Sequence, residues 1–203
     1  MSETYISLEQ QGAVATVWLE RPEVHNAFNA DLIHQLKDCF VALNQRDDVR
    51  VVVLAGRGKS FSAGADLNWM KAAGAASEVE NQADAQQLAD MLYALATLKQ
   101  PTIARVQGAA MGGGMGLANA ASHTIVTETT VMAMPEISIG LYPDAGGTWF
   151  LQHFPFGSGT FLGLTGARFN GSDALLGNVA AASRPADSRA ATLQAFVAAD
   201  WQG

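Results

Sequence analysis

The chain has 203 residues, of which 49% are hydrophobic and 15% charged, so it can bury one sizeable core without disulfides or metal ions. Its formal net charge of −7, without a Lys/Arg cluster, argues against nucleic-acid binding. A single cysteine, Cys39, excludes an internal disulfide, and we expect neither a signal sequence nor a membrane-spanning segment. We expect a cytoplasmic protein that binds no nucleic acid and no membrane.

The N-terminal part of the chain predicts a strand–helix–strand unit. Alternating hydrophobicity over residues 6–9 and 13–19 indicates a β-hairpin. Apolar residues at helical spacing predict a helix that begins near Asn29 or Asp31 and presents one stripe to a core: Leu32, Leu36, Cys39, Phe40 and Leu43. The branched apolar run 49–54 is typical of a strand covered on both faces, as in parallel sheets. In this order, the elements indicate a βαβ unit.

Further elements follow along the chain. Residues 56–66 are rich in glycine and serine and predict a loop, and the small, polar residues 72–82 predict a mobile loop. Apolar residues between 88 and 98 predict a second amphipathic helix, which Pro101 ends. Two further strands are predicted at 102–106 and 124–126. Helices are predicted at 115–121, 146–154, 160–164 and 187–201, and another helix is expected to begin at Ser172 as its N-cap.

No linker, charge block or internal repeat divides the chain. We therefore predict a single domain over residues 1–203, with a core from about 5 to 180.

Three adjacent glycines, Gly112 to Gly114, stand between a strand-like run and a helix-compatible run. Glycines in this position indicate that the backbone approaches a ligand closely. A helix that begins there would direct unpaired N–H groups and a partial positive charge at that ligand. This arrangement suits an oxygen that becomes anionic during a reaction.

Two carboxylates, Glu136 and Asp144, each follow a proline in apolar or glycine-rich surroundings. Such surroundings raise the pKa of an acid and allow proton exchange near neutral pH. The alternative is structural: each residue caps a helix or turn, with Asp144 as an N-cap ahead of Gly146-Gly147. The four histidines lack ligand spacing, so no metal site is expected.

Four motifs in order resemble the crotonase (enoyl-CoA hydratase/isomerase) superfamily. They are RPEVHNA at 21–27, SAGADL at 62–67, QGAAMGGG at 107–114 and MPEISIG at 134–140. The resemblance implies an α/β fold built as a spiral of ββα turns, with residues 187–203 as the start of a shortened C-terminal helical region. It also implies an acyl-CoA thioester substrate, no separate cofactor, and a homotrimer or hexamer.

The same resemblance assigns residues to roles. The backbone N–H groups of Ala65 and Gly113 match the oxyanion hole that holds the thioester carbonyl oxygen. The coenzyme A moiety would lie along two loops, against His25, Ala27, Ala63, Asp66 and Leu67. Lys59 or Lys71 could meet its phosphates.

The acids indicate a branch of the superfamily. Common hydratases carry a glutamate where this chain has Gly116, and a glycine where it has Asp144. With Glu136 retained, residues 107–178 resemble the 3-hydroxyisobutyryl-CoA hydrolases of valine breakdown. Glu136 would then attack the thioester carbon or activate water, and Asp144 would be its partner acid/base.

Two alternatives accompany this interpretation. Residues 14–100 resemble more closely the methylglutaconyl-CoA hydratases of leucine breakdown, which implies a lyase or isomerase with Glu136 as its main acid/base. Members of both groups usually continue for at least fifty further residues. A truncated, non-catalytic protein of the same fold is therefore the third hypothesis.

Overall fold

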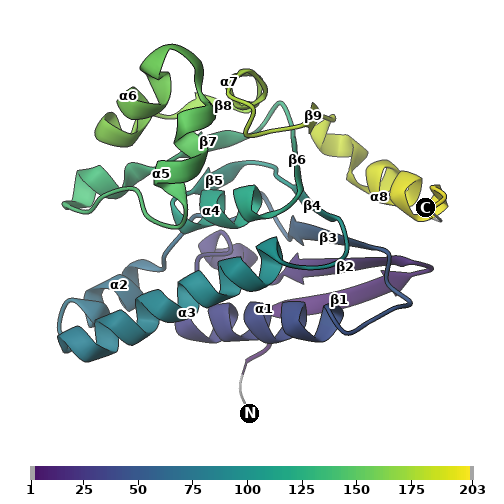
Figure 1. The fold of residues 1–203 in the computed structure, drawn as a ribbon, viewed down its shortest axis with the longest axis horizontal. Coiled ribbons are helices and arrows are strands. Elements are labelled where there is room, and N and C mark those ends of the chain that lie inside the picture. The colour runs from purple at the N-terminus through teal and green to yellow at the C-terminus, as the bar shows by residue number, and fades with distance from the viewer. Residues whose placement is uncertain (1–2, 202–203) are drawn as a thin grey trace.

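The computed structural model describes residues 3–201 and contains two β-sheets (Figure 1). The larger sheet has the strand order β1-β2-β3-β4-β6-β9 and the smaller one β5-β7-β8. The strands of the larger sheet are β1 Ile6–Gln11, β2 Val14–Leu19, β3 Val51–Gly56, β4 Thr102–Arg105, β6 His123–Val126 and β9 Ala182–Ser183. Those of the smaller sheet are β5 Ala109–Met111, β7 Val131–Ala133 and β8 Phe169–Asn170.

Eight α-helices and five short 3-10 helices connect these strands within the described residues. The α-helices are α1 Ala30–Leu43, α2 Leu67–Ala73, α3 Glu78–Ala96, α4 Gly113–Ala120, α5 Gly147–Phe150, α6 Ser158–Thr165, α7 Gly171–Leu176 and α8 Arg189–Ala198. The 3-10 helices are η1 Pro22–Val24, η2 Pro135–Ile139, η3 Leu151–His153, η4 Pro155–Gly157 and η5 Ala186–Ser188.

The predicted βαβ unit is confirmed. β1 and β2 form an antiparallel hairpin, and β2 pairs in parallel with β3 across α1. Every residue of β3 is buried, as its uninterrupted apolar run predicts. Asn29 caps α1, because its side chain accepts a hydrogen bond from the Leu32 N–H at 2.9 Å.

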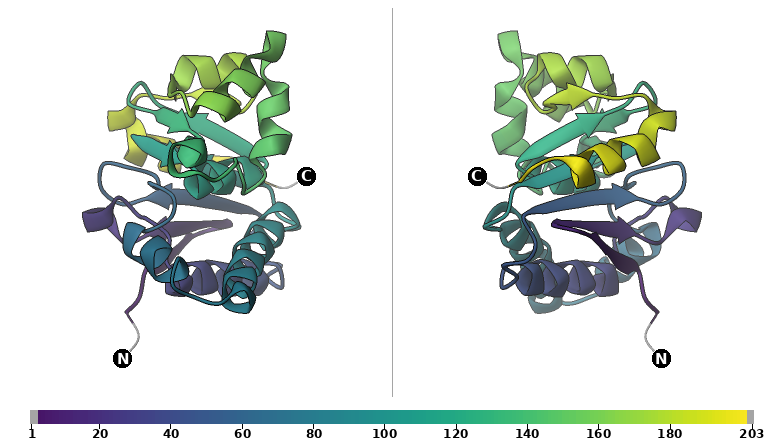
Figure 2. Two further views of the ribbon diagram at one scale, coloured as in Figure 1. Left: turned by 90° about the vertical axis from the view of Figure 1, so that its left-hand side faces the viewer. Right: turned by 90° about the vertical axis from the view of Figure 1, so that its right-hand side faces the viewer.

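Helices cover both faces of the larger sheet. α1 and α3 pack side by side on one face, where Ala15, Val17 and Leu54 belong to the main core (Figure 1). The intervening residues Val14 and Val53 point to the opposite face, because successive side chains alternate along a strand. There they meet Leu193, Phe196 and Val197 of α8, which crosses the sheet in Figure 2, and Trp201, which follows the helix. These four residues form the predicted apolar stripe.

The smaller sheet places the glycine cluster and Glu136 next to each other. Its strand β5 leads directly into Gly112 and α4, and its parallel neighbour β7 leads into Met134 and η2. Both connections leave the same edge of the sheet, since the two strands run in the same direction. The chain then forms α5 and α6 on the side of this sheet and returns at β8 (Figure 1).

Two predictions were wrong. Residues 72–82 do not form one loop, because α2 extends to Ala73 and α3 begins at Glu78. A capping box explains the early start of α3: the Ser77 hydroxyl accepts from the Glu80 N–H, and the Glu80 carboxylate accepts from the Ser77 N–H. Similarly, Asn170 and not Ser172 caps α7, because its side chain accepts from two N–H groups of the first turn.

Candidate active site

Two unpaired backbone amides lie where the loop 62–66 packs against the start of α4. In residues 3–201, neither the Ala65 N–H nor the Gly113 N–H donates a hydrogen bond to the protein. A bridge from Ser62 to Ala110 holds the loop beside β5, and a bridge from Ala65 to Phe28 holds its other end. Gly113 is the first residue of α4, so its amide also carries the positive end of the helix dipole. Both amides are available to an oxygen acceptor.

Glycine is required at two positions around these amides. Gly64 has φ +84°, and a Cβ there would lie 2.6 Å from the Met111 carbonyl oxygen and 3.6 Å from the Gly113 nitrogen. Gly112 has φ +51°, and a Cβ there would overlap Oε1 of Glu136. The glycine backbone thus comes close to a carbonyl group and to the Glu136 carboxylate, whereas its predicted approach to a ligand stays a prediction.

Glu136 is held in the first turn of η2, directly after Pro135. The side chain is buried, and its Oε2 atom has no hydrogen-bond partner among the described residues. Burial raises the pKa of Glu136 from its ordinary 4.5 to about 7. A hydrogen bond from the backbone N–H of Glu136 opposes this rise, and the negative charge of the nearby Asp144 adds to it. The carboxyl can therefore gain and lose a proton near neutral pH.

Asp144 lies between η2 and α5. It has more access to solvent than Glu136, but the surrounding walls desolvate it enough to raise the pKa of its carboxyl above the ordinary value. The alternative role as an N-cap is wrong, because the N-cap of α5 is Gly146 and no side chain caps that helix. The Asp144 carboxylate therefore does not cap α5.

Both carboxylates and both amides line a single cavity of about 210 Å³. Its other walls are apolar and come from segments far apart in the sequence: Phe28, Trp69, Met70, Leu88, Ile139 and Leu141. Sequence reasoning did not identify these residues as cavity walls, because they come from segments that only the tertiary structure brings together. The geometry is suited to holding a carbonyl oxygen while an adjacent acid exchanges a proton.

Gly116 has no room for a side chain. A Cβ at this position would lie 2.5 Å from the carbonyl oxygen of Ala145 and 2.6 Å from its Cβ. The segment that carries Asp144 therefore occupies the space next to Gly116. A glutamate at position 116 would therefore require the segment around Ala145 to move.

The predicted coenzyme A residues separate into two groups. Ala63 and Leu67 line the cavity. The two loops that carry the five predicted residues are joined by a hydrogen bond from the Ala63 N–H to the His25 carbonyl at 2.9 Å. Asp66 has structural contacts, because it caps α2 through the Asn68 N–H and pairs with Arg21 at 3.2 Å.

Ala27 and His25 also lie outside the cavity lining. The Ala27 carbonyl accepts from the Arg21 guanidinium at 2.6 Å. The exposed His25 ring lies 3.1 Å from the Ser60 hydroxyl. Coenzyme A contacts by these residues stay predictions.

The described residues contain no group of three or more His, Cys, Asp or Glu side chains that could hold a metal ion. None of the helices within residues 3–201 is both long and apolar enough to cross a membrane.

The α/β fold of this chain is of the crotonase class, because solved structures of that class superpose on nearly all of it. A crystal structure of an enoyl-CoA hydratase from Shewanella pealeana has this fold, with a TM-score of 0.89 and 30% identity over 98% of this chain and 76% of that one. A model of the enoyl-CoA hydratase/isomerase family matches residues 14–203. The chain belongs to that family.

Two curated relatives add detail. The mitochondrial 3-hydroxyisobutyryl-CoA hydrolase of Gallus gallus is 35% identical over 176 residues, which cover 86% of this chain and 46% of the relative. Small ribosomal subunit protein mS47 of Schizosaccharomyces pombe is 36% identical over 185 residues, which cover 88% of this chain and 42% of that protein. The chain thus spans less than half the length of these relatives. Because one relative is mitochondrial by name, a cytoplasmic location for this chain stays a prediction.

Proposed function

We propose that the chain hydrolyses an acyl-CoA thioester with a short branched 3-hydroxyacyl group, of the 3-hydroxyisobutyryl-CoA type. The observation that carries this proposal is the shared cavity of Glu136, Asp144 and the free amides of Ala65 and Gly113. The absence of space for an acid at Gly116 favours hydrolysis over hydration of a double bond. The name of the chicken relative supports the choice of acyl group.

In this mechanism the thioester carbonyl oxygen accepts hydrogen bonds from the Ala65 and Gly113 amides. Negative charge develops on that oxygen when the carbonyl carbon becomes tetrahedral, and the dipole of α4 stabilises it further. Each donor of this kind contributes on the order of 10²- to 10³-fold in rate. Neither amide has to break a bond within the protein to make this contact.

Glu136 begins the reaction in one of two ways. As a base it takes a proton from water, which attacks the carbonyl carbon; as a nucleophile it attacks that carbon itself and forms an anhydride that water then cleaves. In the base route Glu136 then passes the water proton to the departing sulfur; in the nucleophilic route that proton comes from the water that cleaves the anhydride. Asp144 assists this proton transfer as the partner acid/base. Thioester and water are converted to a carboxylic acid and free coenzyme A. A single turnover in ¹⁸O-water separates the routes, because only the nucleophilic route places label in the Glu136 carboxylate.

The first test measures free thiol released from 3-hydroxyisobutyryl-CoA. Glu136→Gln is expected to lower kcat at least 100-fold, whereas the exposed control Glu23→Gln leaves it unchanged. Equal rates for wild type and Glu136→Gln would remove the proposal.

An enoyl-CoA hydratase or isomerase with a methylglutaconyl-CoA-like substrate is the second candidate, favoured by the name of the Shewanella structure. It requires that the absorbance of the conjugated enoyl thioester be lost faster than coenzyme A is released. It also requires that Asp144→Asn leave this activity unchanged.

A non-catalytic role is the third candidate, since one relative is named as a ribosomal protein. A melting temperature that does not respond to coenzyme A would favour it, because a ligand that binds only the folded state raises stability. Sedimentation of the same sample tests the proposed homotrimer or hexamer.

A further inference from the structure

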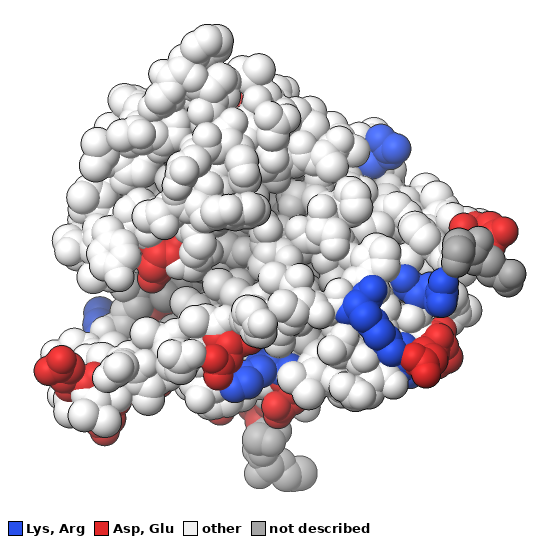
Figure 3. Space-filling model, viewed as in Figure 1, with Lys and Arg blue, Asp and Glu red and all other residues white. Residues whose placement is uncertain are grey.

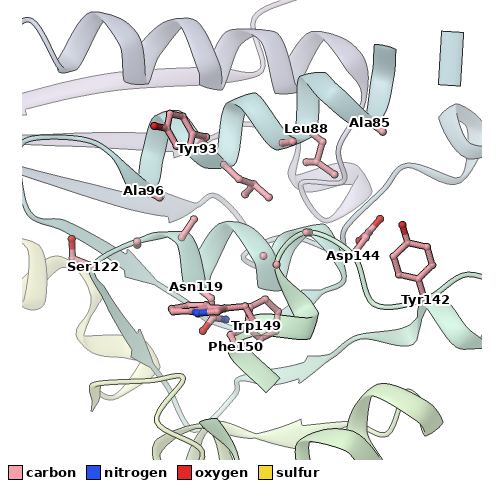
Figure 4. A pocket seen from close by; sticks show the side chains of 17 residues that line it. Ala85, Leu88, Tyr93, Ala96, Asn119, Ser122, Tyr142, Asp144, Trp149 and Phe150 are labelled. Atoms are coloured by element: carbon pink, nitrogen blue, oxygen red, sulfur yellow. The ribbon is translucent and has the colours of Figure 1, made fainter. Parts of the chain in front are cut away.

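The candidate site adjoins a larger hollow on the side of Asp144. A groove of about 860 Å³ runs between α3 as one wall and α4 and α5 as the other (Figure 4). Leu88 and Asp144 line both this groove and the smaller cavity. Ala65 and Gly113 line only the smaller cavity, so an oxygen atom meets both amides there. The direction of the two amides therefore depends on how the loop 62–66 and the start of α4 are held.

The Ala65 amide is aimed by the hydrogen bonds of its neighbours. The Phe28 N–H donates to the Gly64 carbonyl at 2.7 Å, and the Asp66 N–H donates to the Phe28 carbonyl at 2.8 Å. These two bonds form the parallel bridge between Phe28 and Ala65. In such a bridge only the groups that flank Ala65 bond to Phe28, so the N–H of Ala65 itself is directed to the other side. The bridge thus decides where this donor points.

One guanidinium group holds both segments of the bridge. Nη1 of Arg21 donates to the Ala27 carbonyl at 2.6 Å, and Nη2 donates to Oδ2 of Asp66 at 3.2 Å. Ala27 directly precedes Phe28, and Asp66 directly follows Ala65. We call Arg21 with these two contacts the Arg21 clamp. Because the donors of a guanidinium lie in a rigid, planar fork, the clamp sets the separation of the two segments.

Asp66 also connects the clamp to α2. Its Oδ1 atom accepts from the Asn68 N–H at 2.9 Å as the cap of that helix, whereas Oδ2 faces Arg21. The Asn68 N–H lowers the pKa of Asp66, and Arg21 lowers it further against the opposing effect of burial, so the carboxyl is ionised at neutral pH. Since both oxygens are bonded, the carboxylate is held in one orientation.

The ion pair of the clamp is more deeply buried than those on the surface. The face in Figure 3 carries charged side chains of both signs over α1 and α3. The ion pair between these two helices, Lys37–Asp90, leaves 29% and 36% of its side chains exposed, whereas Arg21 and Asp66 leave 11% and 14%. The Arg21 guanidinium also lies 4.8 Å from the centre of the Tyr5 ring. Solvent and salt screen such a pair less than an exposed one.

We propose that Arg21 is a positioning residue for the oxyanion hole. By holding Ala27 and Asp66 at one separation, it fixes the bridge between Phe28 and Ala65, and with it the approach of the Ala65 N–H to the thioester carbonyl oxygen. The inference rests on the proposed function, because it takes this amide as a donor to a thioester. Without the clamp, the hydrogen bond that strengthens most in the transition state is weakened, while binding by the rest of the cavity is retained.

Arg21→Gln tests the inference through kinetics and binding together. The variant is expected to lower kcat for 3-hydroxyisobutyryl-CoA about 10- to 100-fold, because complete loss of one donor costs on the order of 10²- to 10³-fold. The thioether S-butyl-CoA is not hydrolysed and has no carbonyl oxygen, so its Kd is expected to change less than about threefold by isothermal titration calorimetry. An unchanged kcat would overturn the inference. So would a loss of thioether affinity that accounts for the whole change in kcat/KM.

Infrared difference spectra report on the oxyanion hole directly. In Glu136→Gln, a substrate with carbon-13 at the thioester carbonyl stays uncleaved, and hydrogen bonds from the amides lower the frequency of its C=O stretch. Addition of Arg21→Gln is expected to move this band to higher frequency. A band at the same frequency with and without Arg21 would overturn the inference, because a residue that only stabilises the fold does not alter the polarisation of this bond.

Further variants distinguish positioning from a general loss of folding. Asp66→Asn keeps an oxygen that caps α2 but removes the charge that Arg21 binds, so it is expected to lower kcat as well. Its effect is expected not to add to that of Arg21→Gln, because both remove one contact; fully additive effects would contradict the clamp. Arg21→Lys keeps the charge but not the fork, and is expected to restore kcat only in part.

Arg57→Gln is the matched control. Arg57 also pairs with a carboxylate, that of Glu20 at 3.1 Å, and lies over an aromatic ring, but its guanidinium contacts neither Ala27 nor Asp66. It is expected to leave kcat and the C=O band unchanged.

The two kinds of measurement separate this inference from the proposed function. A C=O band that depends on Arg21, in a protein that cleaves no thioester, would support the clamp and reject the hydrolase. Cleavage with equal kcat in wild type, Arg21→Gln and Asp66→Asn would reject the clamp and leave the hydrolase.

Discussion

Replacement of Glu136 by glutamine is expected to stabilise the folded chain at alkaline pH while it removes activity. Burial raises the pKa of Glu136 from 4.5 to about 7, so the folded state holds this proton over a range in which the unfolded state has lost it. The unfolding free energy of the wild type therefore falls as pH rises from about 4.5 to about 7. A pKa change of this size corresponds to about 3–4 kcal/mol over the whole titration.

Glutamine carries no charge at any pH, so it does not incur this cost. The difference in unfolding free energy between Glu136→Gln and wild type is expected to increase by about 2–3 kcal/mol between pH 5 and pH 8, in favour of the variant. Urea denaturation at the two pH values measures it, with Glu23→Gln as the exposed control. A difference that is the same at both pH values would show that Glu136 has no raised pKa, and would refute the assignment of a proton-transfer role on this ground.

Three further predictions concern the surroundings of this carboxylate. Gly112→Ala places a Cβ against Glu136 Oε1 at φ +51° and is expected to lower kcat about 100-fold, with a small change in S-butyl-CoA affinity. Gly116→Glu is expected to destabilise the fold by about 1–3 kcal/mol through overlap with Ala145, and to create no hydratase activity. Asp144→Asn removes a negative charge near Glu136, so the lower pKa in the pH profile of residual kcat/KM is expected to move to lower pH.

Each of these has a contrary outcome that is simple to recognise. Undiminished turnover in Gly112→Ala would show that the position of the carboxylate is not critical. Normal thermal stability together with loss of enoyl absorbance in Gly116→Glu would show that the Ala145 segment moves away freely. An unchanged pKa in Asp144→Asn would show that the two carboxylates do not interact, and a higher pKa would contradict the predicted repulsion between them.

Much of the fold could be predicted from sequence, because hydrophobic periodicity reports local structure directly. The spacing of Leu32, Leu36 and Phe40 describes the buried face of α1, and the branched run of β3 describes a strand with two covered faces. The smaller sheet was not predicted, since β5 and β7 have three residues each, too few to show a period. The start of α3 was missed although Ser77 and Glu80 form the sequence signature of a capping box, because the residues around them carry no apolar stripe.

The sequence alone identified the superfamily through the order of its motifs, and it singled out Glu136 and Asp144 by their prolines and apolar neighbours. Only the tertiary structure decided that these acids share one cavity with the Ala65 and Gly113 amides. The raised pKa of Glu136, the lack of space at Gly116 and the groove beside α3 likewise depend on the packing of segments distant in the chain. Desolvation and excluded volume arise from neighbours in space, and a linear pattern of residues does not specify which neighbours those are.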